Sequence, residues 1–206
     1  MDDVTEAPEA PGALGAPGAP GARLVARLTE AHETVACAES LTAGLVAATV
    51  ADTPGASAVL LGGVVAYAAA VKTALLDVPA DLVARVGTVD PEVAVLMAEG
   101  VRRRLGSTWG LATTGVAGPG PSEGKPAGTV HVAVAGPSGT VTRALGLNGT
   151  RAQIRSATVD AVLRLAVEQT GATPRTPALP REPRGTVGLS GHPGGGPAPD
   201  HTTPGT

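Results

Sequence analysis

Residues 35–44 read Val-Ala-Cys-Ala-Glu-Ser-Leu-Thr-Ala-Gly, and this stretch decides the fold. The mostly small and apolar residues at 34–38 predict a short buried strand that breaks just before Ser40. A helix is expected to follow over residues 41–51. The first N–H groups of a helix have no partner within it and carry partial positive charge, so they can bind an oxyanion or a phosphate. Ser40 is therefore a candidate nucleophile with an oxyanion hole beside it; the alternative is that Ser40 or Thr42 only caps the helix.

The composition of the 206-residue chain separates a middle part from two ends. Ala-Pro-Gly repeats fill residues 1–21, and residues 171–206 are rich in Pro, Gly, Thr and Arg, so both tails are expected to be disordered. Residues 22–170 are long enough for a single domain with its own core. Because only 1% of the chain is aromatic, this core is expected to consist almost wholly of Ala, Val and Leu.

Charge, cysteine content and hydropathy exclude several classes of function. The formal net charge is −3 and no basic block is present, so no direct nucleic-acid binding is expected. Cys37 is the single cysteine; it excludes an intramolecular disulfide, fits a reducing compartment and is expected to pack inside the first strand. The sequence begins with two aspartates after Met1 and has no long apolar run, so neither a signal peptide nor a spanning helix is expected. We therefore expect a cytoplasmic protein without membrane association.

The spacing of hydrophobic residues along the chain predicts the remaining helices and strands. Further helices are expected at residues 23–32, 68–76, 80–86, 91–105 and 150–168, and further strands at 58–67, 109–114, 128–135 and 140–147. The pair Gly62-Gly63 indicates a bulge or close backbone approach, Asp90-Pro91-Glu92 marks a helix start, and residues 136–139 mark a hairpin. Together these patterns predict an α/β fold: a three-layer α/β/α domain whose mixed sheet includes one β-hairpin.

Lysine usage supplies the second candidate for chemistry. Thirteen of the fifteen Lys and Arg residues are arginine, and the only lysines are Lys72 and Lys125. Burial lowers the pKa of a lysine and can turn it into a general base, whereas an arginine stays protonated. Ser40 as nucleophile, Lys72 as base and Tyr67 relaying or orienting the proton form the candidate catalytic trio. The alternative is that Lys72 is a solvated cation on a short helix.

The motifs argue against other chemistries. His131 lies in the middle of a predicted strand and is expected to be a strand-face residue, so a histidine-based triad is not supported. The glycine-rich loop 115–127 does not have Walker A spacing, and Pro126 stands where a magnesium-binding Ser or Thr would be. No cluster of His, Cys, Asp and Glu has metal-ligand spacing, so no metal or other cofactor is expected.

Two other features are candidates for holding an anion. The loop 115–127 can present backbone N–H groups to a substrate phosphate, or it can be a plain surface loop. Arg151 and Arg155 lie one turn apart at the start of the last predicted helix, where cations oppose the helix dipole. A bound anion there would relieve that penalty; the alternative is that both arginines are solvated.

Several motifs follow one another along the chain in a recognisable order. They are Ala-Glu-Ser-Leu-Thr-Ala-Gly at 38–44, Tyr67 with Lys72 and Leu-Leu-Asp-Val at 75–78, Gly-Thr-Val-Asp-Pro-Glu-Val at 87–93, Thr-Gly-Val-Ala-Gly-Pro at 114–119, Lys-Pro-Ala-Gly-Thr at 125–129, and Gly-Thr-Arg at 149–151 with Ile154 and Arg155. In this order they resemble the CinA C-terminal domain family. The family includes nicotinamide-nucleotide amidohydrolases, which hydrolyse nicotinamide mononucleotide to nicotinic acid mononucleotide and ammonia without a metal. The resemblance implies this activity, a small-molecule nucleotide as substrate, and a homodimer.

The resemblance also implies a role for each candidate residue. Ser40 would attack the carboxamide carbon, and Lys72 would assist together with Tyr67. The other matching positions would stabilise the oxyanion through backbone N–H groups or hold the ribose-phosphate end of the substrate. These implied substrate-binding residues are Thr42, Ala43, Gly44, Thr114, Gly115, Gly118 and Arg151.

The sequence departs from the family pattern at three places. Ala43 stands where the family commonly has glycine, alanines at 68–70 replace a more polar stretch, and Thr150 replaces a frequent aspartate. These departures leave the catalytic trio intact and bear on the substrate. Longer members also carry an N-terminal pyrophosphatase-type domain, so a chain of this length resembles the stand-alone form.

Two other functions fit the same residues. One is a hydrolase of the same Ser/Lys type that acts on another small amide. The other is a non-catalytic nucleotide-binding or interaction module, which the association of family members with competence and DNA damage suggests. The joint presence of Ser40, Tyr67 and Lys72 favours an enzyme.

Overall fold

The computed structural model describes residues 18–172, and the remainder of the two predicted tails lies outside the described residues. In chain order the elements are α1 (Pro20–Ala31), β1 (Val35–Glu39), α2 (Leu45–Ala51), a short 3-10 helix η1 (Ala56–Ala58), β2 (Leu60–Val65), α3 (Ala69–Leu76), α4 (Ala80–Val86), α5 (Pro91–Leu105), β3 (Trp109–Gly115), β4 (Thr129–Gly136), β5 (Gly139–Gly146) and α6 (Arg151–Ala172). The predicted α/β class is confirmed, and all predicted helices and strands are present.

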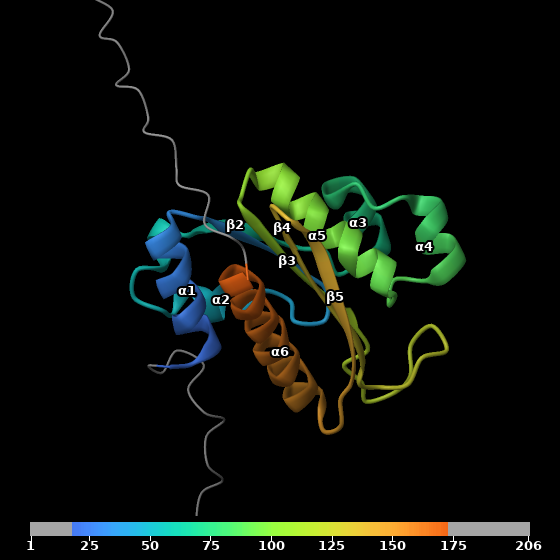
Figure 1. Cartoon of the computed structure of the whole chain (residues 1–206). Coiled ribbons are helices and arrows are strands. Elements are labelled where there is room, and N and C mark those ends of the chain that lie inside the picture. Colours follow the sequence, from blue (N-terminus) through green and yellow to red (C-terminus); the bar gives the residue numbers. More distant parts are fainter. Residues whose placement is uncertain (1–17, 173–206) are drawn as a thin grey trace, which may run out of the picture. The chain divides into compact units, whose positions relative to one another are not determined.

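The five strands form one mixed sheet in the order β2-β1-β3-β4-β5 (Figure 1). Strand β1 is parallel to both β2 and β3, whereas β3, β4 and β5 are successively antiparallel. The predicted hairpin is β4–β5, whose last pair is Gly136 opposite Gly139. Because parallel strands end at the same edge of a sheet, the carboxyl ends of β1, β2 and β3 meet there, where α/β proteins place their sites.

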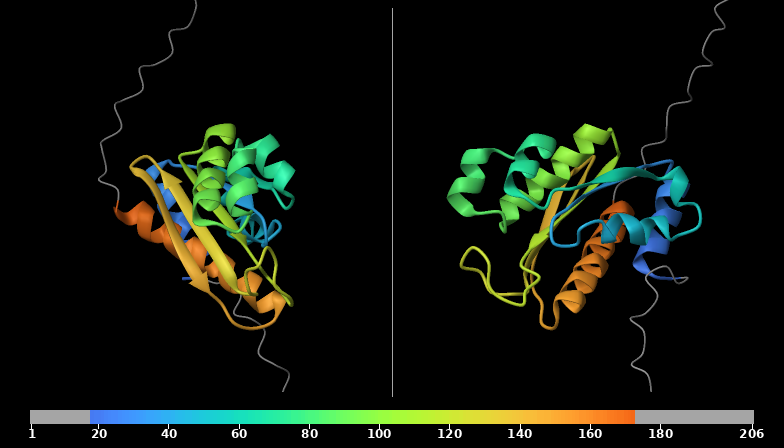
Figure 2. Two further views of the ribbon diagram at one scale, coloured as in Figure 1. Left: turned by 90° about the vertical axis from the view of Figure 1, so that its right-hand side faces the viewer. Right: turned by 180° about the vertical axis from the view of Figure 1, so that it is seen from behind.

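Helices cover both faces of this sheet, as predicted (Figures 1 and 2). One buried cluster joins α1, α2 and α6 to the sheet and includes Leu24, Val46 and Leu163. A second cluster on the opposite face joins α3, α4 and α5 and includes Leu76 and Met97. None of the helices within 18–172 combines the length and hydropathy that a lipid bilayer requires.

Strand β1 lies inside the sheet, between β2 and β3, which explains its composition. All five of its residues are buried, because helices pack on both of its faces. Cys37 is fully buried in it, as predicted. The predicted irregularity at the glycine pair is also confirmed: the register of β1 with β2 shifts before Gly62. A Cβ atom on Gly63 would lie 3.1 Å from the Cys37 carbonyl oxygen, so the two strands approach closely there.

The start of α2 differs from its prediction. The helix begins at Leu45 rather than at residue 41, and residues 41–44 form turns. The reason is local geometry: Ala43 and Gly44 both have positive φ values, 52° and 96°, which a right-handed helix excludes. The backbone after Ser40 is therefore a tight loop and not the first turn of a helix.

Candidate active site

Ser40 lies directly beyond the carboxyl end of β1. Its N–H donates to the Thr113 carbonyl of β3 (3.0 Å), and its own carbonyl accepts from the Ala43 N–H (3.2 Å). The first bond continues the strand pairing and the second closes the loop. Only 8% of the residue is exposed, so the hydroxyl is held in a sheltered place at the sheet edge.

Lys72 meets Ser40 at this edge, although 32 residues separate them in the chain. Its Nζ lies 3.0 Å from Ser40 Oγ, 2.7 Å from the Ala66 carbonyl and 3.3 Å from the Tyr67 carbonyl. The residue is completely buried, so the alternative of a solvated cation on a short helix is wrong. Helix α3 supplies Lys72 and follows the end of β2, which brings the amine over the end of β1.

The protonation state of Lys72 follows from this environment. Burial lowers its pKa from 10.5 to about 8, and the charge of Glu123 opposes this shift only in part. The two carbonyl oxygens accept two N–H bonds, so the lone pair of a neutral amine is left for the Ser40 hydroxyl. The geometry therefore suits transfer of a proton from Ser40 Oγ to Lys72 Nζ.

Tyr67 does not lie where the predicted catalytic trio requires its hydroxyl, beside Ser40 and Lys72. Its hydroxyl bonds to Arg151 Nη2 (2.8 Å), the residue is 56% exposed, and only its backbone carbonyl contacts Lys72. Among the described residues, no hydrogen bond joins the Tyr67 hydroxyl to Ser40 or Lys72. Arg151 also donates to the Gly118 carbonyl (2.9 Å), so three predicted site residues form a bridge between β2, the loop after β3 and α6.

The N–H groups expected to form the oxyanion hole are only partly available. The Gly44 N–H donates to Glu39 Oε2 (2.9 Å), and the Ala43 N–H donates to the Ser40 carbonyl. Within residues 18–172, the N–H groups of Leu41 and Thr42 have no hydrogen-bond acceptor. Of the three N–H donors predicted at residues 42–44, only that of Thr42 is therefore available. The N–H group of Leu41 is a second available donor.

The other predicted binding residues support the scaffold of the site. Thr114 is fully buried and its hydroxyl donates to the Thr88 carbonyl (2.7 Å). A Cβ on Gly115 would lie 2.7 Å from the Thr129 carbonyl oxygen, so this glycine permits a close approach of strands. The Thr42 hydroxyl bonds to the Thr113 hydroxyl (2.8 Å) and ties the loop after Ser40 to β3.

The glycine-rich loop between β3 and β4 is fastened to the segment before α5. Glu123 accepts two bonds from Thr88 (2.7 Å each) and one from the Val89 N–H (3.3 Å), and Lys125 donates to the Val86 carbonyl (3.1 Å). The pKa of Glu123 is lowered, because these hydrogen bonds and the Lys125 charge outweigh the raising effect of burial. The loop is thus anchored at its tip, and its Glu123 carboxylate acts on Lys72.

Sequence reasoning missed Glu39 and gave Arg155 a different role. Glu39 is 2% exposed and its carboxylate accepts N–H bonds from the loop and from α2. Arg155 was expected to face an anion or solvent, but its guanidinium donates to the carbonyls of Leu41 (3.0 Å) and Thr42 (2.7 Å). A glutamate at the end of a fully buried strand was the available signal, because a buried carboxylate requires several hydrogen-bond donors.

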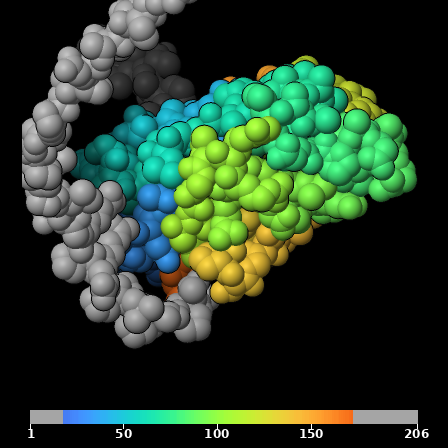
Figure 3. Space-filling view, turned by 90° about the horizontal axis from the view of Figure 1, so that it is seen from above, coloured from blue at the N-terminus to red at the C-terminus, as the bar shows by residue number. Residues whose placement is uncertain are grey.

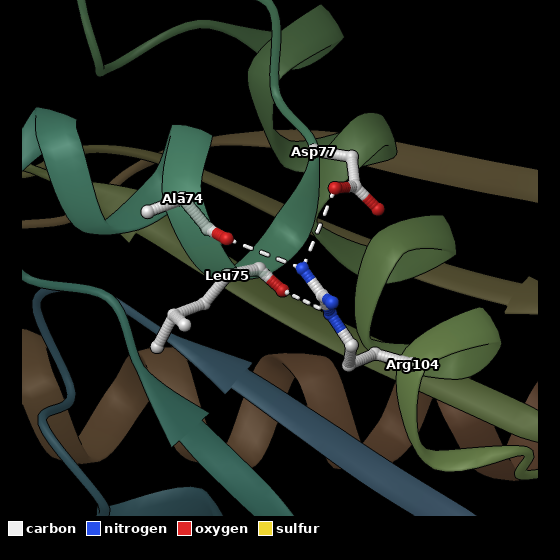
Figure 4. A network of polar contacts seen from close by, with 4 residues as sticks. All are labelled: Ala74, Leu75, Asp77 and Arg104. Carbon is white, nitrogen blue, oxygen red and sulfur yellow. Dashed lines mark hydrogen bonds and ion pairs between the residues drawn. The ribbon is translucent and has the colours of Figure 1, made fainter.

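The position of α3, and hence of Lys72, is fixed at its C-terminal end by α5. Arg104 donates from Nε to the Leu75 carbonyl (3.0 Å) and from Nη2 to the Ala74 carbonyl (3.2 Å) and Asp77 (3.4 Å) (Figure 4). These carbonyls belong to the last turn of α3 and have no partner within it. In the space-filling view the atoms of α3, α4 and α5 lie against one another (Figure 3).

We expect Gly100→Ala to disturb this contact. A Cβ on Gly100 would lie 2.1 Å from the Leu76 carbonyl oxygen, so α3 must move away from α5. The expected cost is about 2 to 3 kcal/mol of unfolding free energy, together with a loss of activity, because Lys72 moves with α3. Urea unfolding measures the first effect. Gly120→Ala, where a Cβ meets no atom within 4 Å, is the control and should change stability by less than about 0.5 kcal/mol. An equally small change at Gly100 would contradict the prediction.

Ala43→Gly is expected to stabilise the protein by about 0.5 to 1 kcal/mol. Ala43 has a φ of 52°, in the left-handed region that penalises a Cβ atom. Ala48→Gly in the exposed face of α2 is the matched control, and it should destabilise by about 1 kcal/mol. Urea denaturation of both variants measures whether the two substitutions change the free energy of unfolding in opposite directions. Destabilisation by both would show that Ala43 is not strained.

The Ser40 hydroxyl is bonded to a buried lysine amine at the carboxyl edge of parallel strands, between two helical layers. This arrangement defines an α/β protein of the kind that supports Ser/Lys nucleophilic chemistry. Comparison with known proteins gives the family. The chain belongs to the CinA C-terminal domain family, which matches residues 20–170 and includes nicotinamide mononucleotide amidohydrolases.

Individual relatives agree with this assignment. The CinA-like protein of Frankia casuarinae is 52% identical over 138 residues, which cover 67% of this chain and 32% of that protein. The CinA-like protein of Anaeromyxobacter dehalogenans strain 2CP-1 is 53% identical, over 64% of this chain and 33% of that protein. The chain thus spans about a third of the length of the curated relatives it matches.

Solved structures show the same fold. The competence/damage inducible protein CihA from Agrobacterium tumefaciens has a TM-score of 0.72 and 32% identity, over 77% of this chain and 96% of that one. A CinA superfamily protein from Escherichia coli has a TM-score of 0.70 and 26% identity, over 73% of this chain and 87% of that one.

Proposed function

We propose that this protein is a serine-dependent amidohydrolase that converts nicotinamide mononucleotide to nicotinic acid mononucleotide and ammonia without a metal. The observation that carries the proposal is the 3.0 Å contact between Ser40 Oγ and a fully buried Lys72 amine. Membership of the CinA C-terminal domain family supports the choice of substrate. The anion-binding candidates at the surface of the site agree with a phosphorylated substrate.

The first half of the reaction forms an acyl-enzyme. The neutral amine of Lys72 accepts the proton of the Ser40 hydroxyl while Oγ bonds to the carboxamide carbon. The carbonyl oxygen becomes an oxyanion, and the N–H groups of Leu41 and Thr42 are the donors available to stabilise it. The carbon–nitrogen bond then breaks, and the Lys72 ammonium returns its proton to the leaving nitrogen, which departs as ammonia.

The second half regenerates the serine. Lys72, again neutral, accepts a proton from a water molecule whose oxygen bonds to the acyl carbon. The ester bond to Ser40 breaks, Oγ recovers the proton from Lys72, and the carboxylic acid product leaves. The two carbonyls that bond Lys72 keep the amine in place through both halves, because neither of them takes part in a proton transfer.

The mouth of the site offers contacts for the rest of the substrate. The guanidinium of Arg151 is exposed and lies against the Tyr67 hydroxyl and the Gly118 carbonyl. A phosphate that replaces either partner would form a charge-assisted, bidentate contact with Arg151. We propose that Arg151 and the glycine-rich loop 115–127, which contains Gly118, hold the ribose-phosphate, with Tyr67 beside them.

The proposal is tested by incubating the purified protein with nicotinamide mononucleotide and measuring ammonia and the acid product. Release of both in equal amounts is expected. If no ammonia forms, the substrate assignment is wrong. A panel of pyridine nucleotides and simple amides then shows whether another amide is hydrolysed, and thermal stabilisation by a nucleotide without turnover would indicate a binding module instead.

The pH dependence of the reaction should report the state of Lys72. With a pKa of about 8, roughly a tenth of the molecules hold a neutral amine at pH 7 and about nine tenths at pH 9. Glu123 is the ionised group whose charge acts on Lys72, and it stays charged over this range because its pKa is lowered. We therefore expect kcat/KM to rise about tenfold from pH 7 to pH 9, with a midpoint near 8. A flat profile would show that Lys72 is not the base.

A further inference from the structure

The carboxylate of Glu39 accepts three N–H bonds beside the site, and the reaction above does not use it. Its Oε2 accepts the N–H groups of Gly44 (2.9 Å) and Val46 (3.0 Å), and its Oε1 accepts that of Ala47 (2.9 Å). Adjacent residues of a strand point to opposite faces of the sheet. Glu39 therefore faces α2, while Ser40 faces α3 and Lys72.

These three bonds decide which N–H groups of the loop are available. A loop that leads into a helix presents several unpaired donors, and any of them can attract a negative oxygen. Glu39 accepts the N–H groups of Gly44, Val46 and Ala47, whereas the N–H groups of Ala43 and Leu45 donate to the carbonyls of Ser40 and Thr42. The free donors of the described loop are then those of Leu41 and Thr42, the two residues directly after the nucleophile.

Arg155 acts on the same loop from α6. Its guanidinium holds the carbonyl oxygens of Leu41 and Thr42 at 3.0 and 2.7 Å. In a trans peptide the C=O and N–H groups point in opposite directions. The bond to the Leu41 carbonyl therefore turns the Thr42 N–H away from Arg155. The bond to the Thr42 carbonyl likewise turns the Ala43 N–H toward the Ser40 carbonyl.

We propose that Glu39 and Arg155 are positioning residues that together build the oxyanion hole of Ser40. Glu39 removes the competing donors and holds the end of the loop, and Arg155 sets the direction of the Thr42 N–H. Neither residue touches the substrate. The inference rests on the proposed function insofar as Ser40 must be an acylated nucleophile, but it does not depend on which amide is the substrate.

The experiment compares Glu39→Gln with a matched control, Glu33→Gln, in the full chain. Glu33 also accepts a structural hydrogen bond, from Trp109 Nε1 (2.6 Å), but it lies before the start of β1, at the opposite end of the strand from Ser40. Two reactions are measured: acylation of Ser40 by p-nitrophenyl acetate, followed by mass spectrometry of the Ser40 peptide, and turnover of nicotinamide mononucleotide. Thermal unfolding and the pH profile are recorded for each variant.

The expected result is a loss of reactivity with little change in binding. Glu39→Gln replaces one acceptor oxygen by an NH₂ group that opposes an N–H donor, so the loop shifts and acylation slows by at least about tenfold. We expect KM to stay within about twofold and the pH midpoint to stay near 8, because Glu39 lies on the other face of the sheet from Lys72. A general loosening of the structure would instead admit water to Lys72 and move that midpoint upward. Glu33→Gln should keep the acylation rate of the unaltered protein.

A second variant keeps the test decisive if Glu39→Gln does not fold. Arg155→Gln removes the fork that holds two carbonyls and should slow acylation to a similar extent, whereas Arg155→Lys, which retains one donor group, should recover part of the rate. Unchanged acylation in both Glu39→Gln and Arg155→Gln overturns the inference. The same holds if their pH midpoint moves upward or if Arg155→Lys gives no recovery.

The controls separate this inference from the proposed function. Acylation of the unaltered protein by the ester, without turnover of nicotinamide mononucleotide, would refute the substrate while leaving the variants fully informative. Turnover that is unaffected in Glu39→Gln would refute the positioning role alone. A protein in which Ser40 reacts with neither compound would refute both.

Discussion

Ser40→Ala is expected to lower the turnover of nicotinamide mononucleotide by about 10⁴-fold or more, because the variant has no oxygen to bond to the carboxamide carbon. The fold should be kept. The bonds that place Ser40 in the structure come from its backbone N–H and carbonyl, which alanine retains. Ammonia release over several hours measures the residual rate, and unfolding in urea shows that the protein is intact.

The matched control for this variant is Ser107→Ala. Ser107 is also buried, but its hydroxyl donates to the Trp109 carbonyl (2.8 Å) in the segment that leads into β3. We expect Ser107→Ala to retain its turnover while losing about 1 kcal/mol of stability. Turnover by Ser40→Ala that is comparable to the unaltered protein would refute covalent catalysis by Ser40.

Lys72→Met should lower kcat by about 10³-fold and abolish the rise of activity between pH 7 and pH 9. Methionine matches the length of the lysine stem but cannot accept a proton, so no base remains beside Ser40. Lys125→Met is the control, because the Lys125 amine donates to the Val86 carbonyl and does not contact Ser40. We expect it to lose less than about tenfold. A Lys72→Met variant that keeps the pH-dependent rise would show that another group is the base.

The same variant tests the energetic cost of burying the amine. The pKa of Lys72 is lower in the folded protein than in the unfolded chain, so the unfolded chain binds more protons between about pH 8 and pH 10.5. Stability therefore rises with pH in this window. From pH 7.5 to 9.5 the contribution of Lys72 should improve by about 2 kcal/mol. Urea unfolding of the unaltered protein minus that of Lys72→Met isolates this change; a difference independent of pH would contradict the lowered pKa.

The sequence predicted much of the fold because its signals are local. Asp90 caps α5 by accepting the Glu92 N–H (2.8 Å), as the Asp-Pro-Glu triplet indicates. The glycine pair of β2 and the turn at 136–139 affect the backbone only over a few neighbouring residues, and both were placed correctly. The start of α2 was misplaced, because the positive φ of Ala43 depends on contacts of the loop with α6 and β3.

The site was predictable in its residue types but not in its connections. A lysine in an arginine-rich chain and a serine after a buried strand were sufficient to propose a pair. The partner of the Tyr67 hydroxyl could not be predicted in this way. Arg151 lies 84 residues further along the chain and reaches Tyr67 only when α6 packs beside the sheet edge. Glu39 was overlooked for the same reason.

By itself the sequence determined the order of helices and strands and the resemblance to the family, and it singled out Ser40 and Lys72 as the candidate pair. Hydrophobic spacing and short motifs carry this information, since each acts over a few residues. Only the tertiary structure decided that the amine lies 3.0 Å from the hydroxyl and that Leu41 and Thr42 retain free N–H groups. Those facts depend on where separate elements converge, because burial and hydrogen bonding of Lys72 and Glu39 arise only once α2, α3 and α6 pack on the sheet.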